Sequence, residues 1–587
     1  MEQSAKVTSS IESESIAKNC DEKLYIQTTS EIESQSQKQS RWKNFRDSFK
    51  RMEHGNSSSS SSLDLEDAQP KNNLQNNDLK KGLKKRQLQM IALGGCVGSG
   101  LLVASGMALR NGPGTLLVAW AIVSSFLYCT MQSLAELSSA FPLSGSFATY
   151  ANRFIDPSWG FAMGWNYALF WVIVMPLELV ASSITINFWQ SSVNSVAWVA
   201  IFYVLIIVLN LCGNRGFGET EFVASVIKLL GIVGFNILAI ILICGGGDQG
   251  FIGGKFYRNP GSFTTGFKGV VSVLITATYS LAGTELIGLT TSESEGNPRI
   301  MLPKAIKQVF WRIMIFYMLT LTLIGFLVPA NSEDLIGGSG ASASPFVIAI
   351  RQGGIKVLPS IFNVIVLVAL LAIGNSAVYG FSRTVLALAE QGLAPKIFNY
   401  VDRQGRPLVG IMVCAIIGLL AFVSASPKEA EVFAWLVALS GLSTLFTWGS
   451  INASYLRFRA AYKYHGRDLQ ELPYISNTGI IGAWYGLIMN AIVLGLQLFW
   501  IGIWPIGAKP DAKAYFENNL AFVIVIAFYV GHKIYSRTLK FYRTVDEIDI
   551  DTGRTQEEID LLLQEKAEEI EAAKLRPVYK RILNFWC

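Results

Sequence analysis

Long apolar stretches recur along this chain between residues 88 and 536, each close to or longer than the roughly 20 residues that a helix needs to cross a bilayer. Charged residues make up 16% of the 587 residues, against about 25% in soluble domains. They are concentrated at the two ends and in short connectors. The chain is therefore predicted to be an all-α polytopic membrane protein, and its net charge of +6 reflects Lys and Arg beside the spans rather than a nucleic-acid partner.

We predict twelve transmembrane helices, at residues 88–108, 114–137, 161–189, 196–213, 219–244, 268–292, 308–328, 359–388, 408–424, 431–456, 480–503 and 517–536. An even number places both ends on one side, and the Lys and Arg of the tails and of the connectors on that side place both ends in the cytosol. Residues 1–79, rich in Ser, Gln and Asn, are predicted to be a disordered tail. Ten helices form a transport core over 80–456. A connector with helices 11 and 12 follows over 457–536, and 537–587 form a cytosolic tail.

Two of the predicted spans are interrupted. The first carries four glycines within residues 94–100, and glycine costs a helix about 1 kcal/mol relative to alanine. The sixth is interrupted near residues 279–285. If 88–244 and 268–456 are inverted repeats of five helices each, the two breaks are equivalent and form one substrate site near the middle of the membrane. Close helix packing of the GxxxG type is the alternative explanation of the glycine cluster.

The two breaks predict complementary binding groups. The half-helix that follows residues 98–100 presents backbone N–H groups and a positive dipole end, which suit a carboxylate. Carbonyl groups near residues 279–282 suit an ammonium group. Together they match a zwitterion, and a free α-amino acid is the commonest small one. The residues predicted to bind substrate at the breaks are Gly98, Ser99, Gly100, Tyr279, Ser280 and Ala282.

Ionisable side chains deep in a membrane are costly and are candidates for function. Lys228 in the fifth span and Glu178 in the third are predicted to take part in proton coupling, although a permanent ion pair of Lys228 or a structural carboxylate is the alternative for each. Glu285, at the end of the second break, is a candidate gate or a support of the unwound turn. Glu136 is predicted to make a structural contact.

A polar stripe in the eighth span contains Asn375 and Ser376, which are predicted to line the substrate cavity or to form interhelical hydrogen bonds. No GxxxxGK[ST], HExxH or GxSxG motif is present. An enzyme is therefore not expected, and transport must use an ion or substrate gradient. The cysteines show no metal-ligand spacing, so neither a metal nor a cofactor is predicted.

Several motifs resemble those of fungal amino-acid permeases, the yeast amino acid transporter family of the amino acid–polyamine–organocation superfamily. They include residues 89–95, 154–157, 176–179, 218–222, 307–312, 344–349 and 585–587. The resemblance is greatest to the general, broad-specificity permeases and covers nearly everything from residue 79 to the end. It implies a five-plus-five inverted-repeat fold, proton-coupled uptake at the plasma membrane and Lys228 in the place that sodium takes in sodium-coupled relatives.

The same resemblance implies features of the tails. The terminal Cys587 resembles a palmitoylation site, and lysines of the N-terminal tail resemble ubiquitylation targets that ubiquitin ligase adaptors select, with trafficking through the endoplasmic reticulum and endosomes.

The predicted function is secondary active import of L-amino acids by proton symport and alternating access, in a lipid bilayer. Two alternatives remain, an amino-acid sensor whose long cytosolic tails signal, and an exchanger without net proton coupling.

Overall fold

The structure, a computed structural model, describes residues 47–51, 90, 97–143, 145–190, 192–289, 298–337, 344–425, 429–507, 509–538 and 540–552, with 564, 567–568, 571 and 577. The described residues form helices and turns and no β-strand, which confirms the all-α prediction. Two units are distinguished. In the smaller, Arg51 and Asp402 form an isolated antiparallel bridge, and Arg403 N donates to Lys50 O over 3.0 Å.

The larger unit contains two runs of helices that follow the same order of lengths. The first run consists of η1 and α3 (Gly100–Ala104 and Ser105–Leu109), α4 (Pro113–Ala140), α5 (Ser146–Phe154), α6 (Pro157–Ile186), α7 (Ser195–Leu211) and α8 (Gly213–Ile243). The second consists of α9 and α10 (Gly266–Leu281 and Leu286–Leu289), α11 (Pro298–Leu327), α13 (Pro345–Gln352), α14 (Leu358–Glu390), α15 with η7 (Leu408–Gly418 and Leu419–Ala425) and α16 (Glu429–Tyr464). The second run starts with an interrupted segment, and each run has one short helix between two long ones.

Shorter elements and a final helix pair complete this unit. They are η2 (Asn187–Trp189), η3 (Tyr257–Gly261), α12 (Glu333–Gly337), η6 (Lys396–Asn399), η8 (Leu469–Glu471), α17 with η9 (Gly479–Leu496 and Gln497–Ile501) and α18 (Ala512–Ser536).

Eleven of the twelve predicted spans coincide with described helices, and the second half of the first span coincides with η1 and α3. Seven described helices are long and apolar enough to cross a membrane, and four further apolar helices are shorter. The protein is therefore a multi-pass membrane protein, while the number of spans stays a prediction. The short helices α5 and α13 were not predicted, because eight or nine residues of mixed polarity carry little periodic signal.

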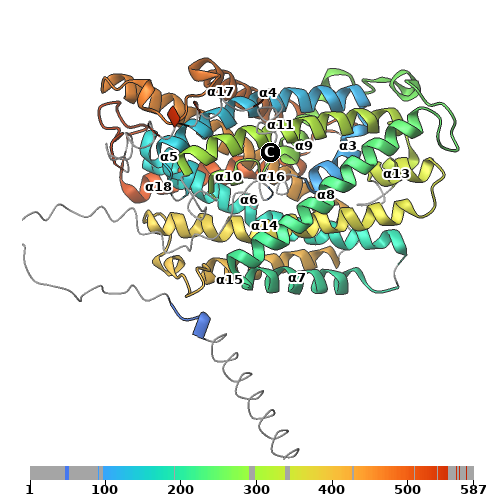
Figure 1. The fold of residues 1–587 in the computed structure, drawn as a ribbon, viewed down its shortest axis with the longest axis horizontal. Coiled ribbons are helices and arrows are strands. Elements are labelled where there is room, and N and C mark those ends of the chain that lie inside the picture. Colours follow the sequence, from blue (N-terminus) through green and yellow to red (C-terminus); the bar gives the residue numbers. More distant parts are fainter. Residues whose placement is uncertain are drawn as a thin grey trace, which may run out of the picture. The chain divides into compact units, whose positions relative to one another are not determined.

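The two runs pack in matched pairs. The long helices α6 and α14 pack on each other, and so do α4 and α11. Two further contacts correspond: α7 packs on α6 as α15 packs on α14, and α16 packs on α6 as α8 packs on α14. The short helices also correspond. In each run the short helix contacts the first segment of the other run: α13 contacts η1, and α5 contacts α10. Figure 1 shows one result, α7 and α15 side by side along α14.

A buried ion pair joins α4 to α16. Arg459 Nε lies 2.9 Å from Glu136 Oε1, and both side chains are almost fully buried. The other carboxylate oxygen accepts hydrogen bonds from Tyr455 OH over 2.9 Å and from Ser476 N over 2.7 Å. Glu136 is thus held from three directions, which confirms the predicted structural contact.

The segment 540–552 is not helical and binds the end of α5. Arg543 N donates to Ile155 O over 2.8 Å, and Arg153 pairs with Asp549 at 3.4 Å. Ile548 and Ile550 are buried. Within the segment, hydrogen bonds from Lys540 and Thr544 lower the pKa of Glu547 to about 2, so its contacts are formed throughout the physiological pH range.

The first prediction concerns the buried pair. Arg459→Met should destabilise the purified protein by about 3–5 kcal/mol, because it leaves the Glu136 carboxylate buried without its counter-charge. The measurement is a thermal unfolding curve in detergent. Arg467→Met is the matched control, since Arg467 pairs with Asp551 at a partly exposed site and such pairs contribute about 1 kcal/mol or less. Equal losses for the two variants would contradict this assignment.

Candidate substrate site

The first break brings its backbone very close to two other helices. The segment enters a π-helical turn at Gly100, and Leu102 N donates to Gly98 O over 2.9 Å. A Cβ on Gly98 would lie 1.9 Å from Ile373 Cδ1 of α14, and a Cβ on Gly100 would lie 2.4 Å from Ser280 Cα of α9. Gly98 and Gly100 therefore serve close packing as well as the break. Residues 94–96 of the predicted cluster lie outside the described residues.

The second break follows Leu281, where α9 ends. Ala282 is extended and Gly283 has a φ of 91°, before α10 begins at Leu286. The predicted break at 279–285 is confirmed, and its non-helical residues are 282–285. Glu285 supports the break, because Oε1 accepts from Gly283 N over 3.2 Å and Oε2 accepts from Trp448 Nε1 of α16 over 3.2 Å.

The carbonyl groups of the second break already have partners. Ala282 N donates to Tyr279 O over 3.2 Å, and Tyr317 OH donates to Ser280 O over 2.9 Å. Thr284 Oγ1 donates to Leu281 O over 2.9 Å. Each carbonyl oxygen keeps a second lone pair. These carbonyl oxygens can therefore each accept one more hydrogen bond.

A small pocket lies where the two breaks meet α6 and α14. One side is polar and consists of Ser99, Glu178, Tyr279 and Ser280, with the backbone of Gly100 and Ala282. The other side is apolar and consists of Phe170, Trp171, Val174 and Ile373. Six of the seven residues predicted to bind substrate or to couple protons at the breaks and in α6 are thus brought to one place.

Three side-chain oxygens of the pocket form a compact cluster. Ser99 Oγ lies 2.5 Å from Glu178 Oε1 and 2.6 Å from Tyr279 OH, which in turn lies 3.1 Å from Glu178 Oε1. All three residues are buried. Glu178 Oε2 and Ser280 Oγ have no hydrogen-bond partner among the described residues. The pocket therefore offers two open polar atoms beside an apolar wall, as a small amphiphilic solute requires.

Comparison with known proteins decides the family. The model of the family "Amino acid permease" matches residues 87–541. Amino-acid permease GAP6 of Candida albicans is 67% identical, with 96% of this chain and 98% of the relative aligned. General amino-acid permease GAP2 of Candida albicans is 53% identical (87% and 88% covered), and general amino-acid permease GAP1 of Saccharomyces cerevisiae is 50% identical (93% and 92% covered).

The chain belongs to the amino-acid permease family. The predicted resemblance to fungal amino-acid permeases is confirmed, and the protein is a transporter of amino acids across a membrane.

In this permease Lys228 lies on α8, away from the pocket wall. Lys228 Nζ is 3.3 Å from Glu221 Oε1, and both side chains are buried. The pairing is the alternative that the sequence left open for Lys228. Glu221 itself was missed, although it lies seven residues before Lys228 and so on the same helix face, two turns away.

Asn375 and Ser376 of the permease do not line the pocket. Asn375 Oδ1 accepts from Asn210 Nδ2 of α7 over 2.8 Å, and Ser376 Oγ donates to Glu221 Oε2 over 3.3 Å. The prediction that they bind substrate is thus not supported by their positions, because the rotation of α14 turns them toward α7 and α8. Their contacts are the interhelical hydrogen bonds that the sequence had left as the alternative.

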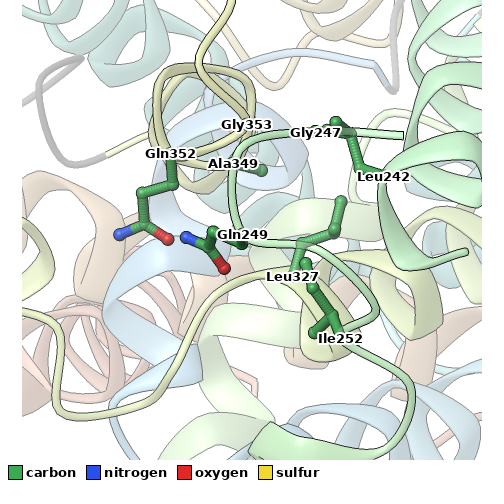
Figure 2. A pocket seen from close by; sticks show the side chains of 8 residues that line it. All are labelled: Leu242, Gly247, Gln249, Ile252, Leu327, Ala349, Gln352 and Gly353. Atoms are coloured by element: carbon green, nitrogen blue, oxygen red, sulfur yellow. The ribbon is translucent and has the colours of Figure 1, made fainter. Parts of the chain in front are cut away.

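Figure 2 shows a different hollow, beside the end of α8. Its walls include the apolar Leu242, Ile252 and Leu327, and the side-chain amides of Gln249 and Gln352 point toward each other across it. None of its lining residues is charged. This hollow lacks groups that neutralise the two charges of an amino acid, so the pocket at the breaks is the better candidate. The predicted lipidation site Cys587 and the tail lysines before residue 47 lie outside the described residues.

The close approach of the two breaks gives the second prediction. Gly100→Ala should reduce amino-acid uptake at least tenfold at equal surface abundance, because the added methyl group meets the backbone of Ser280 and forces the breaks apart. A misfit of only about 1.4 kcal/mol gives that factor. Gly234→Ala in α8 is the control, since its Cβ would meet no atom within 4 Å and uptake should stay within about twofold. Normal uptake by Gly100→Ala would refute the packing argument.

Proposed function

We propose that this permease imports L-amino acids across the plasma membrane into the cytosol by proton symport and alternating access. The observation that carries the proposal is the pocket at the meeting point of two broken helices, with the cluster of Ser99, Tyr279 and Glu178 on its polar side. Both ends of the chain lie in the cytosol in this proposal, as the distribution of Lys and Arg indicates.

The matched packing of the two runs of helices supports an inverted repeat over 88–244 and 268–456. In that arrangement one half can rock against the other around a fixed site, which is how secondary transporters expose a site to either side. Glu285 has an indirect role in gating in this proposal. One carboxylate oxygen accepts from the second break and the other from Trp448 of α16, so Glu285 holds the turn of the break against that helix.

We assign the α-carboxylate to the turn at Gly98, Ser99 and Gly100, where η1 begins. The α-amino group is assigned to the second break, where Ser280 Oγ and the remaining lone pairs of the carbonyl groups accept hydrogen bonds. The side chain of the substrate then lies against the apolar wall. General permeases among the relatives support a broad range of side chains.

A count of hydrogens supports Glu178 as a proton-carrying group. Three oxygen–oxygen contacts of 2.5, 2.6 and 3.1 Å need three hydrogens. The hydroxyls of Ser99 and Tyr279 supply one each. An ionised Glu178 leaves one short contact without a hydrogen, whereas a protonated Glu178 completes a ring of three hydrogen bonds. The compact cluster therefore favours the protonated acid, and its opening favours release of the proton.

The resemblance alone supports the remaining assignments, palmitoylation of Cys587 and ubiquitylation of N-terminal lysines by adaptor-guided ligases.

The third prediction tests proton symport. In cells that lack their own permeases, accumulation of a labelled neutral amino acid should rise as the outside is made more acidic and should collapse when a protonophore removes the gradient. Glu178→Gln should lose this accumulation, because an amide cannot carry the proton, while exchange of internal for external substrate continues. Accumulation that does not change with the pH gradient would refute proton symport. Accumulation driven by the pH gradient in the Glu178→Gln variant would refute the role of Glu178.

The fourth prediction tests the apolar wall. Val174→Ala removes two methyl groups from the wall, and at about 0.8 kcal/mol for each buried group the affinity for leucine should fall roughly tenfold. The affinity for glycine, which has no side chain to place there, should change little. Competition of unlabelled leucine and glycine against one labelled substrate measures both. Equal losses would show that Val174 does not contact the substrate side chain.

A further inference from the structure

A groove that shares no residue with the substrate pocket lies beside the last helix of the larger unit. It is lined by the beginning of α6, by residues 392–395 after α14 and by the second half of α18. Its volume is about 620 Å³, within the range of about 300–1,000 Å³ that is usual for small-molecule sites. On α18 the lining runs from Ala527 to Tyr535, which corresponds to about 12 Å along a helix.

The wall of the groove is aromatic and is held in place by other protein groups. Its ring-bearing residues are Phe161, Trp165, Phe528, His532 and Tyr535. The ring of His532 stacks on Phe161 with the centroids 4.6 Å apart, and its Nδ1 lies 3.0 Å from Ser158 Oγ. Trp165 Nε1 donates to Leu393 O over 3.1 Å, which fastens residues 392–395 to α6. The groove therefore has a defined shape.

Two glycines keep the groove open. A Cβ on Gly392 or on Gly531 would meet no atom within 4 Å. Glycine is a poor helix former, yet Gly531 lies inside α18 and no neighbouring protein atom requires it there. A glycine in a helix allows another molecule to approach the backbone closely. Gly531 thus gives room for a ligand between α18 and residues 392–395.

Positive charge surrounds the groove, whose lining contains no acidic residue. Within two residues of the lining along the chain, the cations are Lys396, Lys533 and Arg537. Glu390 is the one acid in the same range. Asp156 pairs with Lys533 at 3.0 Å, whereas Lys396 and Arg537 are exposed and have no ion pair among the described residues. Two cations are therefore available to an anion beside the groove.

The surface of α18 next to the groove suits hydrocarbon. This helix exposes three apolar residues spaced by four, Ile526, Val530 and Ile534. The residue that follows each of them lines the groove, so the exposed apolar stripe and the groove are neighbours on one helix. Trp and Tyr in the wall are residues enriched where a membrane meets water. The groove thus combines an entry from hydrocarbon with an aromatic wall and a cationic end.

We propose that the groove binds one anionic phospholipid of the cytosolic leaflet, with its phosphate against Lys396 and Arg537 and an acyl chain along the aromatic wall. Basic pockets between transmembrane helices on the cytosolic side bind acidic lipid headgroups. The charges select the anionic class, and the orientation proposed above, with both ends in the cytosol, selects the leaflet. A bound lipid joins α18 to α6 and to the segment after α14, the two long helices that form the apolar wall of the substrate pocket.

The fifth prediction compares two dioleoyl phospholipids, phosphatidylserine and phosphatidylcholine, by native mass spectrometry of the purified full-length protein. The wild-type protein should retain one phosphatidylserine per chain and bind it about tenfold more tightly than phosphatidylcholine, because two cations face the headgroup. Gly531→Leu places a side chain in the groove and should lose the retained lipid. Gly234→Leu is the matched control, since this exposed glycine of α8 also has no atom within 4 Å of its Cβ but lies outside the groove.

A second variant tests the charges without filling the groove. Lys396→Gln combined with Arg537→Gln should bind the two phospholipids about equally, and it serves if Gly531→Leu does not fold. Equal binding of both lipids by the wild-type protein, or phosphatidylserine retained by Gly531→Leu, would overturn the proposal. So would a sterol that displaces phosphatidylserine, or a wild-type dimer that Gly531→Leu converts to monomers, because a sterol or a second chain would then occupy the groove. Binding is measured in detergent, so its outcome depends neither on proton symport nor on orientation in a membrane.

Discussion

The approach of the first break to α9 and α14 is the contact on which the site depends. No side chain fits between these elements at Gly98 or Gly100, where a Cβ would meet Ile373 and Ser280. Ser99 lies between the two glycines, and the closeness of the backbones carries its hydroxyl to 2.5 Å from Glu178. Larger residues at either position would separate the breaks and open the cluster. Packing and interruption, two rival explanations of the glycines, are therefore parts of one arrangement.

Burial explains why the charges of the membrane-spanning part have partners within the protein. Hydrocarbon offers no hydrogen bonds, so an unpaired ion there is very costly. The chemistry of the partner then separates structural acids from acids that can exchange a proton. Glu136 is fixed by a guanidinium, and Glu285 by N–H groups of the break and of Trp448. Glu178 has two hydroxyl partners, which can rearrange their hydrogens, whereas Glu221 is held in an ion pair with Lys228.

The sequence predicts the helices well because hydropathy and span length are local properties. It also predicts the breaks, since the glycines and the polar run near 279–285 disturb those properties locally. Prediction fails where the rotation of a helix matters. Asn375 and Ser376 are polar residues of an apolar helix, yet only packing decides that they face α7 and α8 rather than the pocket. Glu221 was overlooked because it lies at the third residue of the predicted span 219–244, where a carboxylate suggests the membrane surface.

Each run of helices supports the break of the other run, and this arrangement bears on how one substrate site could open to either side of the membrane. The first break is backed by α13, a short helix of the second run, and the second break is backed by α5, a short helix of the first. A displacement of either run against the other therefore changes the support of both breaks at once. Tight packing cannot be kept in both places when rigid bodies rotate, because close-packed interfaces switch between discrete fits rather than deform continuously. In the proposed mechanism, the crossed support of the breaks thus ties the opening of one side to the closing of the other.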